Sequence, residues 1–187
     1  MNTSVIISGF GGQGALFAGM LLCHTAMKEN KFTTWIPAYG AEMRGGAVHC
    51  SVNISDDEIP SPVIDQADVV IALNNNSLVK FENRVKAGGI MIINSSLAFS
   101  PTTRDDIEYI KIPFNELGQT IEQPTFVNVM ALGAFIEKTG ILKLDSIIEV
   151  MKEMATNISE KKAALLPNNI ESVKLGSQAV KNQMVIV

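Results

Sequence analysis

The sequence predicts an α/β fold: a Rossmann-like, mostly parallel sheet flanked by helices, with a helical C-terminal part. Two observations predict it. Short β-branched runs alternate with helical segments up to residue 112, and only helical periodicity follows. The runs Ala67–Leu73 (ADVVIAL) and Gly89–Ser96 (GIMIINSS) are continuously apolar, which is typical of strands covered on both faces of a parallel sheet. We therefore expect one domain over residues 1–187, a length sufficient to bury a core.

The first expected strand, Ser4–Ser8, leads through a glycine-rich turn into a helix at Gln13–Asn30. From Ala15 to Met27 this helix carries no charged residue, and a helix that is apolar nearly all round is buried on more than one side. Either the C-terminal helices or another subunit covers its second side. Charged residues make up 18% of the chain, against about 25% in typical soluble domains, which favours a subunit.

The remaining elements follow from local patterns. Ala47–Ile54 (AVHCSVNI) alternates residue by residue and predicts a strand with two different faces. A short helix at Ser77–Val85 should end at Gly88-Gly89, because glycine is a common C-terminal stop. The other expected strands are Phe32–Ile36, ended by Pro37, and Tyr109–Ile112; the other expected helices are Phe126–Lys138, ended by Gly140, Ser146–Met154, and one that begins near Pro167.

The turn after the first strand has the spacing G-x-G-x-x-G, which is typical of dinucleotide-binding sites. Such sites also need an Asp or Glu at the end of the second strand to bind the ribose, and here that position is occupied by Trp35, Ile36 and Pro37. NAD or FAD binding is therefore poorly supported. A tight turn that binds nothing is one alternative, and a phosphate or coenzyme A contact is another. The candidate contact residues are Gly9, Gly11, Gly12, Gln13 and Gly14.

The other strand ends offer no group for acid–base or nucleophilic catalysis. They carry Asn74–Asn76 and Asn94–Ser96, which hydrogen-bond well but do not titrate near neutral pH. Cys23 and Cys50 are far apart and form no C-x-x-C pair, so a zinc or iron–sulfur site is not expected. We expect neither catalytic nor metal-binding residues in this chain.

The charge and hydropathy of the chain restrict the classes of partner that we expect. The net charge is −4 without a long basic run, so nucleic acid and acidic membranes are not expected partners. The longest apolar stretch, Ala15–Met27, is shorter than the roughly 20 residues of a membrane span. The N-terminus has no basic region of a signal peptide, so we expect a cytoplasmic protein.

Four motifs occur in a fixed order along the chain. They are GFGGQG (Gly9–Gly14), AYGAEMRGG (Ala38–Gly46), IPSP (Ile59–Pro62) and the strand start Ala67-Asp68. In this order they strongly resemble the gamma subunit of the 2-oxoacid:ferredoxin oxidoreductases. Among the branches of that family, the chain looks most like the 2-oxoglutarate type, with the pyruvate, branched-chain and indolepyruvate types as neighbours.

The resemblance implies a subunit of an enzyme complex. Such complexes decarboxylate a 2-oxoacid, here 2-oxoglutarate, oxidatively to its acyl-CoA and pass electrons to ferredoxin or flavodoxin. They use thiamine diphosphate, Mg²⁺, iron–sulfur clusters and coenzyme A. The resemblance assigns thiamine and the clusters to other chains, so the implied partners are an alpha (pyrimidine-side), a beta (thiamine diphosphate) and a ferredoxin-like delta subunit. This chain would be structural and lie near coenzyme A, without catalysis of its own. The alternative is a free-standing Rossmann-like protein that binds a nucleotide or coenzyme A.

The stretch YGAEMRGG fits an interface or an anion contact. Arg44 offers a planar, permanently charged donor fork, and Tyr39 combines apolar area with a hydroxyl group. Gly45 and Gly46 let the backbone approach another surface closely. Glu42 pairs with Arg44 or with a basic residue of a partner; an incidental surface pair within this chain is the alternative.

Overall fold

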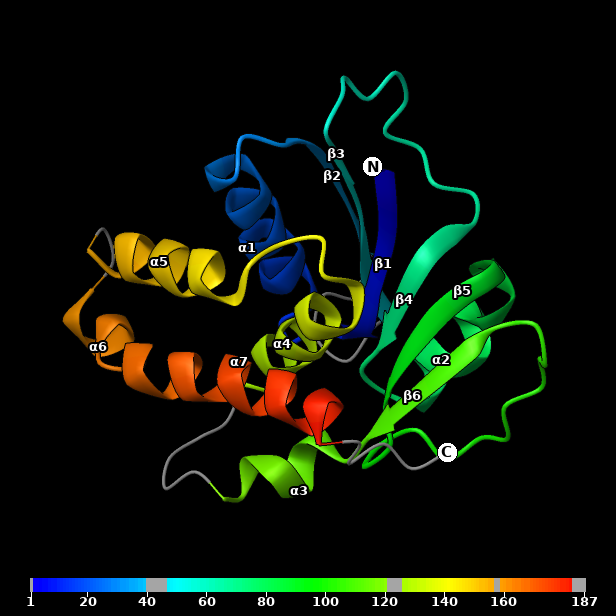
Figure 1. Cartoon of the computed structure of the whole chain (residues 1–187). Coiled ribbons are helices and arrows are strands. Elements are labelled where there is room, and N and C mark those ends of the chain that lie inside the picture. Colours follow the sequence, from blue (N-terminus) through cyan, green and yellow to red (C-terminus); the bar gives the residue numbers. More distant parts are fainter. Residues whose placement is uncertain (1, 40–46, 121–125, 157–158, 183–187) are drawn as a thin grey trace.

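A computed structural model of the chain describes residues 2–39, 47–120, 126–156 and 159–182. Within these ranges a six-stranded sheet carries helices on both faces (Figure 1). The strands are β1 (Asn2–Phe10), β2 (Phe32–Tyr39), β3 (Ala47–Ser55), β4 (Ala67–Ala72), β5 (Val85–Asn94) and β6 (Glu108–Ile112). The helices are α1 (Ala15–Lys28), α2 (Asn75–Phe81), the 3₁₀ turn η1 (Glu82–Arg84), α3 (Phe114–Gly118), α4 (Val127–Thr139), α5 (Leu144–Ala155), α6 (Glu160–Ala163) and α7 (Leu166–Lys181).

The strand order is β2-β3-β1-β4-β5-β6. The pairs β1–β4, β4–β5 and β5–β6 are parallel, whereas β3 runs antiparallel to both β1 and β2. The predicted α/β class with a mostly parallel sheet is confirmed, with β3 as the reversed strand. Its alternating sequence matches this position, because Cys50 and Val52 are fully buried on one face while His49 and Ser51 are half-buried on the other.

The core lies on both faces of the sheet. Successive residues of β1 point to opposite faces, so Val5 and Ile7 pack under α1 and α4 while Ile6 packs with the residues beneath α2. All three side chains are at most 1% exposed. Helices α1, α4, α5 and α7 cover the larger face (Figure 1), so the helical C-terminal part completes the core.

Helices α4 and α7 cross at two glycines. A Cβ atom on Gly133 would overlap the backbone of Val173, and one on Gly176 would overlap the backbone of Met130. The two backbones therefore lie closer than side chains would allow. This contact fixes α4 firmly beside the sheet, with its first turn near the start of α1.

Two predicted boundaries are wrong. Pro37 lies inside β2 rather than ending it; β2 is the last strand at one side of the sheet, and an edge strand tolerates a residue without an N–H group. Gly88 and Gly89 lie inside β5 rather than closing a helix, because α2 ends at Phe81 and η1 follows. Gly88 has a φ of +75°, and a Cβ atom on Gly89 would lie 2.8 Å from the Asp68 carbonyl oxygen.

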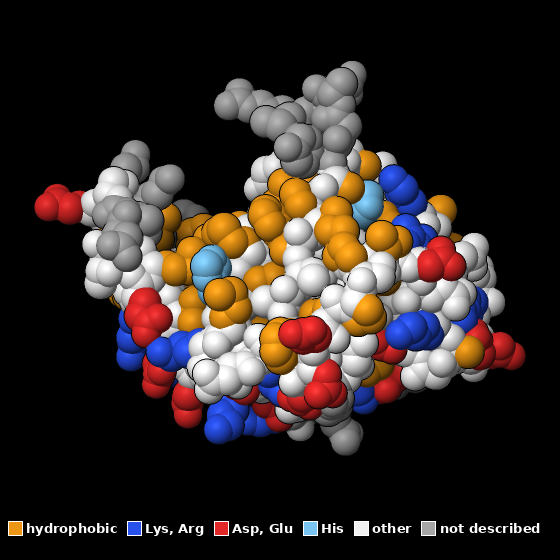
Figure 2. Space-filling view, turned by 90° about the horizontal axis from the view of Figure 1, so that it is seen from above, with side chains coloured by type: hydrophobic (Ala, Val, Ile, Leu, Met, Phe, Trp, Pro, Cys, Tyr) orange, Lys and Arg blue, Asp and Glu red, His pale blue; other side chains and the backbone are white. Residues whose placement is uncertain are grey.

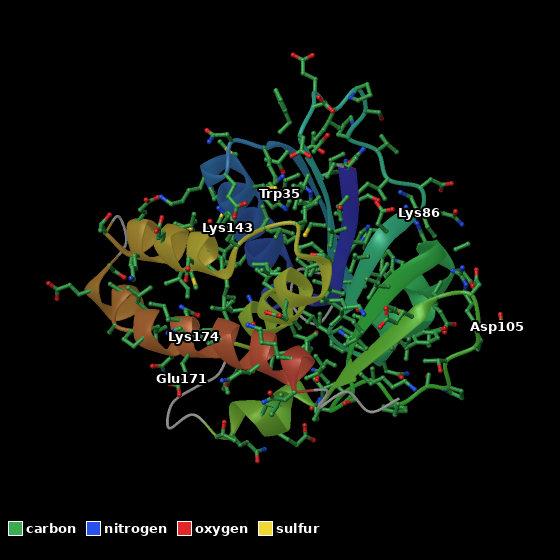
Figure 3. All side chains as sticks on the ribbon, in the orientation of Figure 1. Trp35, Lys86, Asp105, Lys143, Glu171 and Lys174 are labelled. Atoms are coloured by element: carbon green, nitrogen blue, oxygen red, sulfur yellow. The ribbon has the colours of Figure 1, made fainter. Side chains whose placement is uncertain are left out.

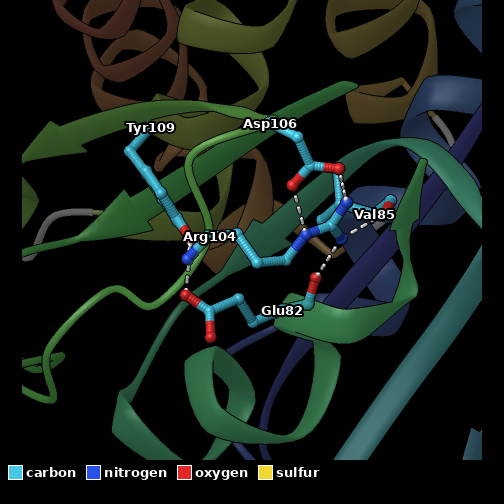
Figure 4. Close-up of polar contacts among 5 residues, drawn as sticks. All are labelled: Glu82, Val85, Arg104, Asp106 and Tyr109. Carbon is cyan, nitrogen blue, oxygen red and sulfur yellow. Dashed lines mark hydrogen bonds and ion pairs between the residues drawn. The ribbon is translucent and has the colours of Figure 1, made fainter. Parts of the chain in front are cut away.

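The long connection from β5 to β6 is held by a buried carboxylate (Figure 4). Glu82 accepts hydrogen bonds from the Tyr109 hydroxyl (2.5 Å) and from the Thr103 N–H (2.9 Å). Arg104 donates to the Val85 carbonyl (2.6 Å) and pairs with Asp106 (2.6 Å). Burial opposes ionisation of Glu82, but the hydrogen bonds from Thr103 and Tyr109 outweigh it and lower its pKa. The connection is thus tied to η1.

Candidate functional site

The glycine turn lies at the carboxyl end of β1 and opens α1. Gly12 (φ +102°) and Gly14 (φ +76°) both adopt the left-handed region, which side-chain-bearing residues rarely enter. Gly14 is the N-cap of α1, and neither a capping side chain nor an acidic first-turn residue is present there. The first N–H groups of α1 therefore lack side-chain partners from this helix, and its partial positive charge is uncompensated.

Gln13 holds this turn to the neighbouring strand. Its Oε1 accepts hydrogen bonds from the Phe10 N–H (2.7 Å) and from Asn74 Nδ2 (2.7 Å), and its Nε2 lies 3.4 Å from the Leu73 carbonyl oxygen. Gly9 makes room for it, because a Cβ atom there would lie 2.9 Å from Gln13 Oε1. Gln13 and Gly9 thus position the turn, while Gly11, Gly12 and Gly14 line the space beside it.

Two clefts flank the turn. The first, here called the amide cleft, has a volume of about 630 Å³ and lies toward α4 and α7. It is lined by Gly12, Gln13, Gly14, Phe17, Asn94, Leu97, Asn115, Phe126, Val127, Asn128, Leu165 and Asn169. The second, here called the apolar cleft, has a volume of about 680 Å³ and lies toward β2 and β3. It is lined by Phe10, Gly11, Gly12, Gly14, Ala15, Leu16, Trp35, Pro37 and Val48. Among these described lining residues there is no charged side chain.

Asparagine side chains organise the amide cleft. Asn94, the last residue of β5, is fully buried; its Nδ2 donates to the Leu73 carbonyl (3.2 Å) and to Asn115 Oδ1 (2.9 Å). Its Oδ1 has no hydrogen-bond partner among the described residues. Asn128, in the first turn of α4, donates from Nδ2 to the Gly14 carbonyl (3.1 Å). Asn128 thus joins the starts of α1 and α4, whereas Asn94 joins the end of β5 to Leu73 after β4 and to Asn115 of α3.

The titratable groups closest to the turn are poor catalysts. Burial raises the pKa of the Cys50 thiol to about 12, and burial also raises the pKa of Cys23. Both thiols therefore stay protonated at neutral pH. His49 packs against the Phe81 ring at 4.9 Å between centroids, and burial, with Lys80 and Arg84 nearby, lowers its pKa. No group of three or more His, Cys, Asp or Glu side chains in the described parts of the chain is placed to hold a metal ion.

The structure brings together only part of the predicted site. Gln13 accepts a hydrogen bond from Asn74, and Gly12, Gln13 and Gly14 line one cleft with Asn94 at the carboxyl ends of the strands. Gly9 and Gly11 do not line that cleft, and a phosphate contact of the turn stays a prediction. Tyr39 is the last residue of β2, and Glu42, Arg44, Gly45 and Gly46 lie outside the described residues. The amides that come from later elements, Asn115, Asn128 and Asn169, were not predicted from the sequence. Only Asn128 had a usable signal, because it is an uncharged amide in the first turn of a helix that is apolar up to Ile136.

The apolar helix α1 is covered on only part of its second side. Helix α5 packs beside it, and Lys28 pairs with Glu149 (3.2 Å) and Glu153 (2.7 Å) of α5. Phe17 and Met27 nevertheless remain 40% and 59% exposed. Hydrophobic side chains gather in a band across the upper part of the view in Figure 2, whereas charged side chains gather lower down and at the sides. Among the residues that the structure describes, no helix is both long and apolar enough to cross a membrane.

The chain is similar to a known protein family and to several known sequences. Residues 4–179 match the family model described as pyruvate ferredoxin/flavodoxin oxidoreductase. Ketoisovalerate oxidoreductase subunit VorA from Methanothermobacter marburgensis is 38% identical over 142 residues, 75% of this chain and 29% of VorA. The 2-oxoglutarate synthase subunit KorC from Methanocaldococcus jannaschii is 30% identical over 168 residues, 88% of this chain and 90% of KorC. The chain thus spans about a third of the length of the VorA relatives that it matches and most of the length of KorC.

Solved structures share the fold. The gamma subunit of a keto/oxoacid ferredoxin oxidoreductase from Geobacter sulfurreducens superposes with a TM-score of 0.82 at 23% identity, covering 97% of this chain and 98% of that chain. A 2-oxoglutarate:ferredoxin oxidoreductase from Magnetococcus marinus superposes with a TM-score of 0.85 at 19% identity, covering 97% of this chain and 31% of that one. At these identities the likeness concerns the fold alone.

Proposed function

This chain belongs to the pyruvate ferredoxin/flavodoxin oxidoreductase family as a gamma-type subunit, and from this premise we propose that it is a structural, coenzyme A-proximal component of a 2-oxoacid:ferredoxin oxidoreductase. In that complex a 2-oxoacid is oxidised and decarboxylated to its acyl-CoA, with ferredoxin or flavodoxin as the electron acceptor. Thiamine diphosphate with Mg²⁺ and the iron–sulfur clusters belong to partner subunits. The glycine turn fits this division, because its described surroundings are neutral amides and apolar side chains rather than the carboxylates or thiolates that such groups need.

The observation that carries the proposal is an uncharged, partly exposed edge of the sheet. Neither β2 nor β3 contains a charged residue, and β2 is the edge strand. Natural edge strands are usually protected from association by charges, proline, bulges or short length. Strand β2 contains Pro37, but it carries no charge and is eight residues long. Phe32, Trp35 and Ile36 of β2 are 47%, 38% and 37% exposed. Trp35 lies on the face of the sheet that α1 covers, whereas Phe32 and Ile36, which pair with Ser55 and Ser51 of β3, lie on the other face. With Met27 of α1 they flank the β2 edge from both faces, and we call this edge the α1–β2 surface.

Trp35 connects the two parts of this surface. Its side chain lies against α1 (Figure 3), where a Cβ atom on Gly19 would come 2.9 Å from the indole Nε1. Gly19 therefore leaves a slot that holds the tryptophan ring at the border of α1 and β2. Half-buried tryptophans of this kind are frequent anchors of protein interfaces. We propose that the thiamine-bearing partner covers the α1–β2 surface.

The proposed docking is tested by purification from the native cell. The tagged chain should bring down a thiamine-binding subunit under mild conditions. Ile36→Lys, which puts a charge in the centre of the edge, should weaken recovery of the partner about tenfold or more, as expected for a charge buried in an interface core. Phe99→Lys is the matched control, because Phe99 is 84% exposed in the β5–β6 connection, outside this surface. Recovery of the unmodified chain alone would overturn the proposal.

We propose 2-oxoglutarate as the 2-oxoacid. In support, the KorC relatives match over most of their own length, and the KorC from Methanocaldococcus jannaschii does so over 90%. The VorA relatives are 38% and 34% identical, but the match covers only 29% and 35% of their length, so ketoisovalerate is the first competitor and pyruvate the second. Ferredoxin reduction by the purified complex, measured with each of the three acids and coenzyme A, decides between them. A higher kcat/KM for ketoisovalerate or pyruvate would replace 2-oxoglutarate.

A second function, a free-standing Rossmann-like protein that binds a nucleotide or coenzyme A, is favoured by the uncapped start of α1 behind the glycine turn. In this role Gly9, Gly11, Gly12, Gln13 and Gly14, with Arg44 from the Tyr39–Gly46 stretch, would hold the phosphates. Calorimetric titration of the isolated chain with NAD, FAD, ATP and coenzyme A tests it. Binding of coenzyme A that weakens in Arg44→Ala would assign Arg44 to the contact, and unchanged affinity would remove it.

A further inference from the structure

We propose that the partner subunit at the α1–β2 surface also extends across the outer face of β2 and β3, where it places a carboxylate side chain against Lys80 and Arg84. The inference rests on the proposed function, because it concerns the same partner. It adds which face of the sheet the partner covers beyond the edge, and which charge the partner carries there.

The outer β2–β3 face is the one turned away from α1. Residues that pair across two neighbouring strands point to the same face of a sheet. On this face the pairing brings together Phe32, Ile36 and Ala38 of β2 with Ser51 and His49 of β3. None of these side chains is charged at neutral pH, apart from any protonated fraction of the histidine.

The described part of the chain leaves this face without a covering layer. The core cluster beneath α2 takes its strand residues from β1, β4, β5 and β6, and none of its described members comes from β2 or β3. Phe32 and Ile36 are 47% and 37% exposed, whereas Ile6, on the same face of the neighbouring β1, is fully buried. Since α/β folds normally cover both faces of the sheet, a second molecule is the remaining source of a cover.

Two cations of α2 and η1 border the outer β2–β3 face. Lys80 Nζ lies 5.3 Å from the centroid of the Phe81 ring, and the His49 ring packs on the same ring at 4.9 Å between centroids. Arg84 follows in η1, where its guanidinium group donates to two backbone carbonyls of the β3–β4 connection. Burial, with Lys80 and Arg84 as charged neighbours, lowers the pKa of His49, so the electrostatic potential at this border is positive.

Neither Lys80 nor Arg84 forms an ion pair with a carboxylate of the described residues. Other cations of the chain do form such pairs; they are Lys28, Lys31, Lys86, Arg104, Lys138 and Lys181. Glu82 is the acidic residue of α2 and η1, and its carboxylate is bound to Thr103 and Tyr109 instead. The positive charge beside the outer face is therefore not compensated by α2 or η1.

The uncovered face and the uncompensated charge together define the partner. An uncharged, partly apolar face that ends at two cations fits a protein surface with apolar side chains and a carboxylate at the matching place. Nucleic acid and acidic membranes need a more extended basic surface than two cations provide. Phe32 and Ile36 belong both to the outer face and to the α1–β2 surface, so one partner covers the two without interruption.

Zero-length cross-linking tests the contact in the complex purified from the native cell. A carbodiimide activates carboxylates and joins them as amides to amino groups that touch them. We expect mass spectrometry to find the peptide that contains Lys80 linked to an Asp or Glu of the thiamine-binding partner. An intact complex in which Lys80 forms no link to that partner would overturn the inference.

Charge variants test whether the contact contributes to binding. Lys80 is exposed, and Lys80→Glu should lower recovery of the partner at least tenfold, because repulsion replaces attraction between close charges. Lys80→Gln should lower recovery less, and its recovery should depend less on salt between about 0.05 and 0.5 M than that of the parent chain. Lys174→Glu, at an exposed position of α7 over the other face of the sheet, is the matched control. Equal recovery with Lys80→Glu and Lys174→Glu would overturn the inference.

The same purification separates this inference from the proposed function. Loss of the partner with Ile36→Lys but not with Lys80→Glu would overturn only the extension across the outer face and would leave the docking at the α1–β2 surface in place. Recovery of the unmodified chain without any thiamine-binding subunit would overturn both. Loss of the partner with each of the two variants, and not with Lys174→Glu, is the result that we expect.

Discussion

Gln13 shows what a single buried polar side chain does in this protein. Its amide joins the Phe10 N–H, the Asn74 side chain and the Leu73 carbonyl, and so connects the glycine turn to the end of β4. Glu82 does the same for the β5–β6 connection through Thr103 and Tyr109. Both residues shape the chain locally by satisfying backbone and hydroxyl groups that would otherwise be buried unpaired.

Glu82→Gln should lower the free energy of unfolding by about 2 kcal/mol at pH 7, because charge-assisted hydrogen bonds are lost and an amide N–H₂ faces donors. The folded-state pKa of Glu82 lies below its unfolded value, so its contribution is complete above the unfolded pKa and is lost as pH falls through the folded pKa. Urea denaturation at pH 7 and at pH 3 should therefore show a smaller difference between variant and parent at the lower pH. Exposed Glu58→Gln is the control. An equal difference at both pH values would contradict this account.

At the scale of elements, the paired glycines of α4 and α7 decide where the C-terminal helices lie. Gly133 and Gly176 let the two backbones touch, and this contact holds α4 so that Asn128 reaches Gly14. Glycine is a poor helix former by about 1 kcal/mol relative to alanine, so its presence in both helices is explained by packing rather than by helix propensity.

Gly133→Ala should destabilise the protein by about 1–3 kcal/mol despite the better helix propensity of alanine, because the added methyl group overlaps the Val173 backbone. Thermal unfolding followed by circular dichroism measures it. Lys174→Ala, at an exposed position of α7, is the control and should change stability by about 0.5 kcal/mol or less. A higher melting temperature for Gly133→Ala would show that α4 and α7 do not pack this closely.

On the scale of the whole molecule, the two edges of the sheet differ in charge. The far edge of the sheet ends in β6, where Glu108 pairs with Lys138 at 2.6 Å, whereas the opposite edge ends in the uncharged β2. Exposed, uncharged edge strands associate with other chains. We therefore expect the α1–β2 surface to form one side of an interface.

Without its partner, the isolated chain should associate with itself through this edge as its concentration rises. Sedimentation velocity from about 1 to 100 μM, the range in which weak self-association appears, measures the effect. Ile36→Lys should keep the chain monomeric, while Phe99→Lys should not. A parent chain that stays monomeric at all concentrations would contradict self-association through β2. Equal suppression of self-association by both variants would contradict it as well.

The sequence by itself determined the fold class, the strand–glycine turn–helix unit at the N-terminus and the family motifs. These depend on hydrophobic periodicity and on glycine spacing, which are local properties of the chain. It also led to wrong boundaries at Pro37 and at Gly88-Gly89, because the same residues that end elements elsewhere are tolerated at a sheet edge or at an irregular strand.

Only the tertiary structure decided the reversal of β3, the edge position of β2 and the meeting of Gly14, Asn94 and Asn128 at one cleft. These three residues are more than thirty positions apart from one another, and no local pattern encodes their contact. Strand order and helix crossing bring them together, since both are set by the sum of long-range packing in the core. The glycine turn and the strand-end amides Asn74 and Asn94 were therefore visible in the sequence, whereas the cleft amides of the later helices, Asn115, Asn128 and Asn169, were not.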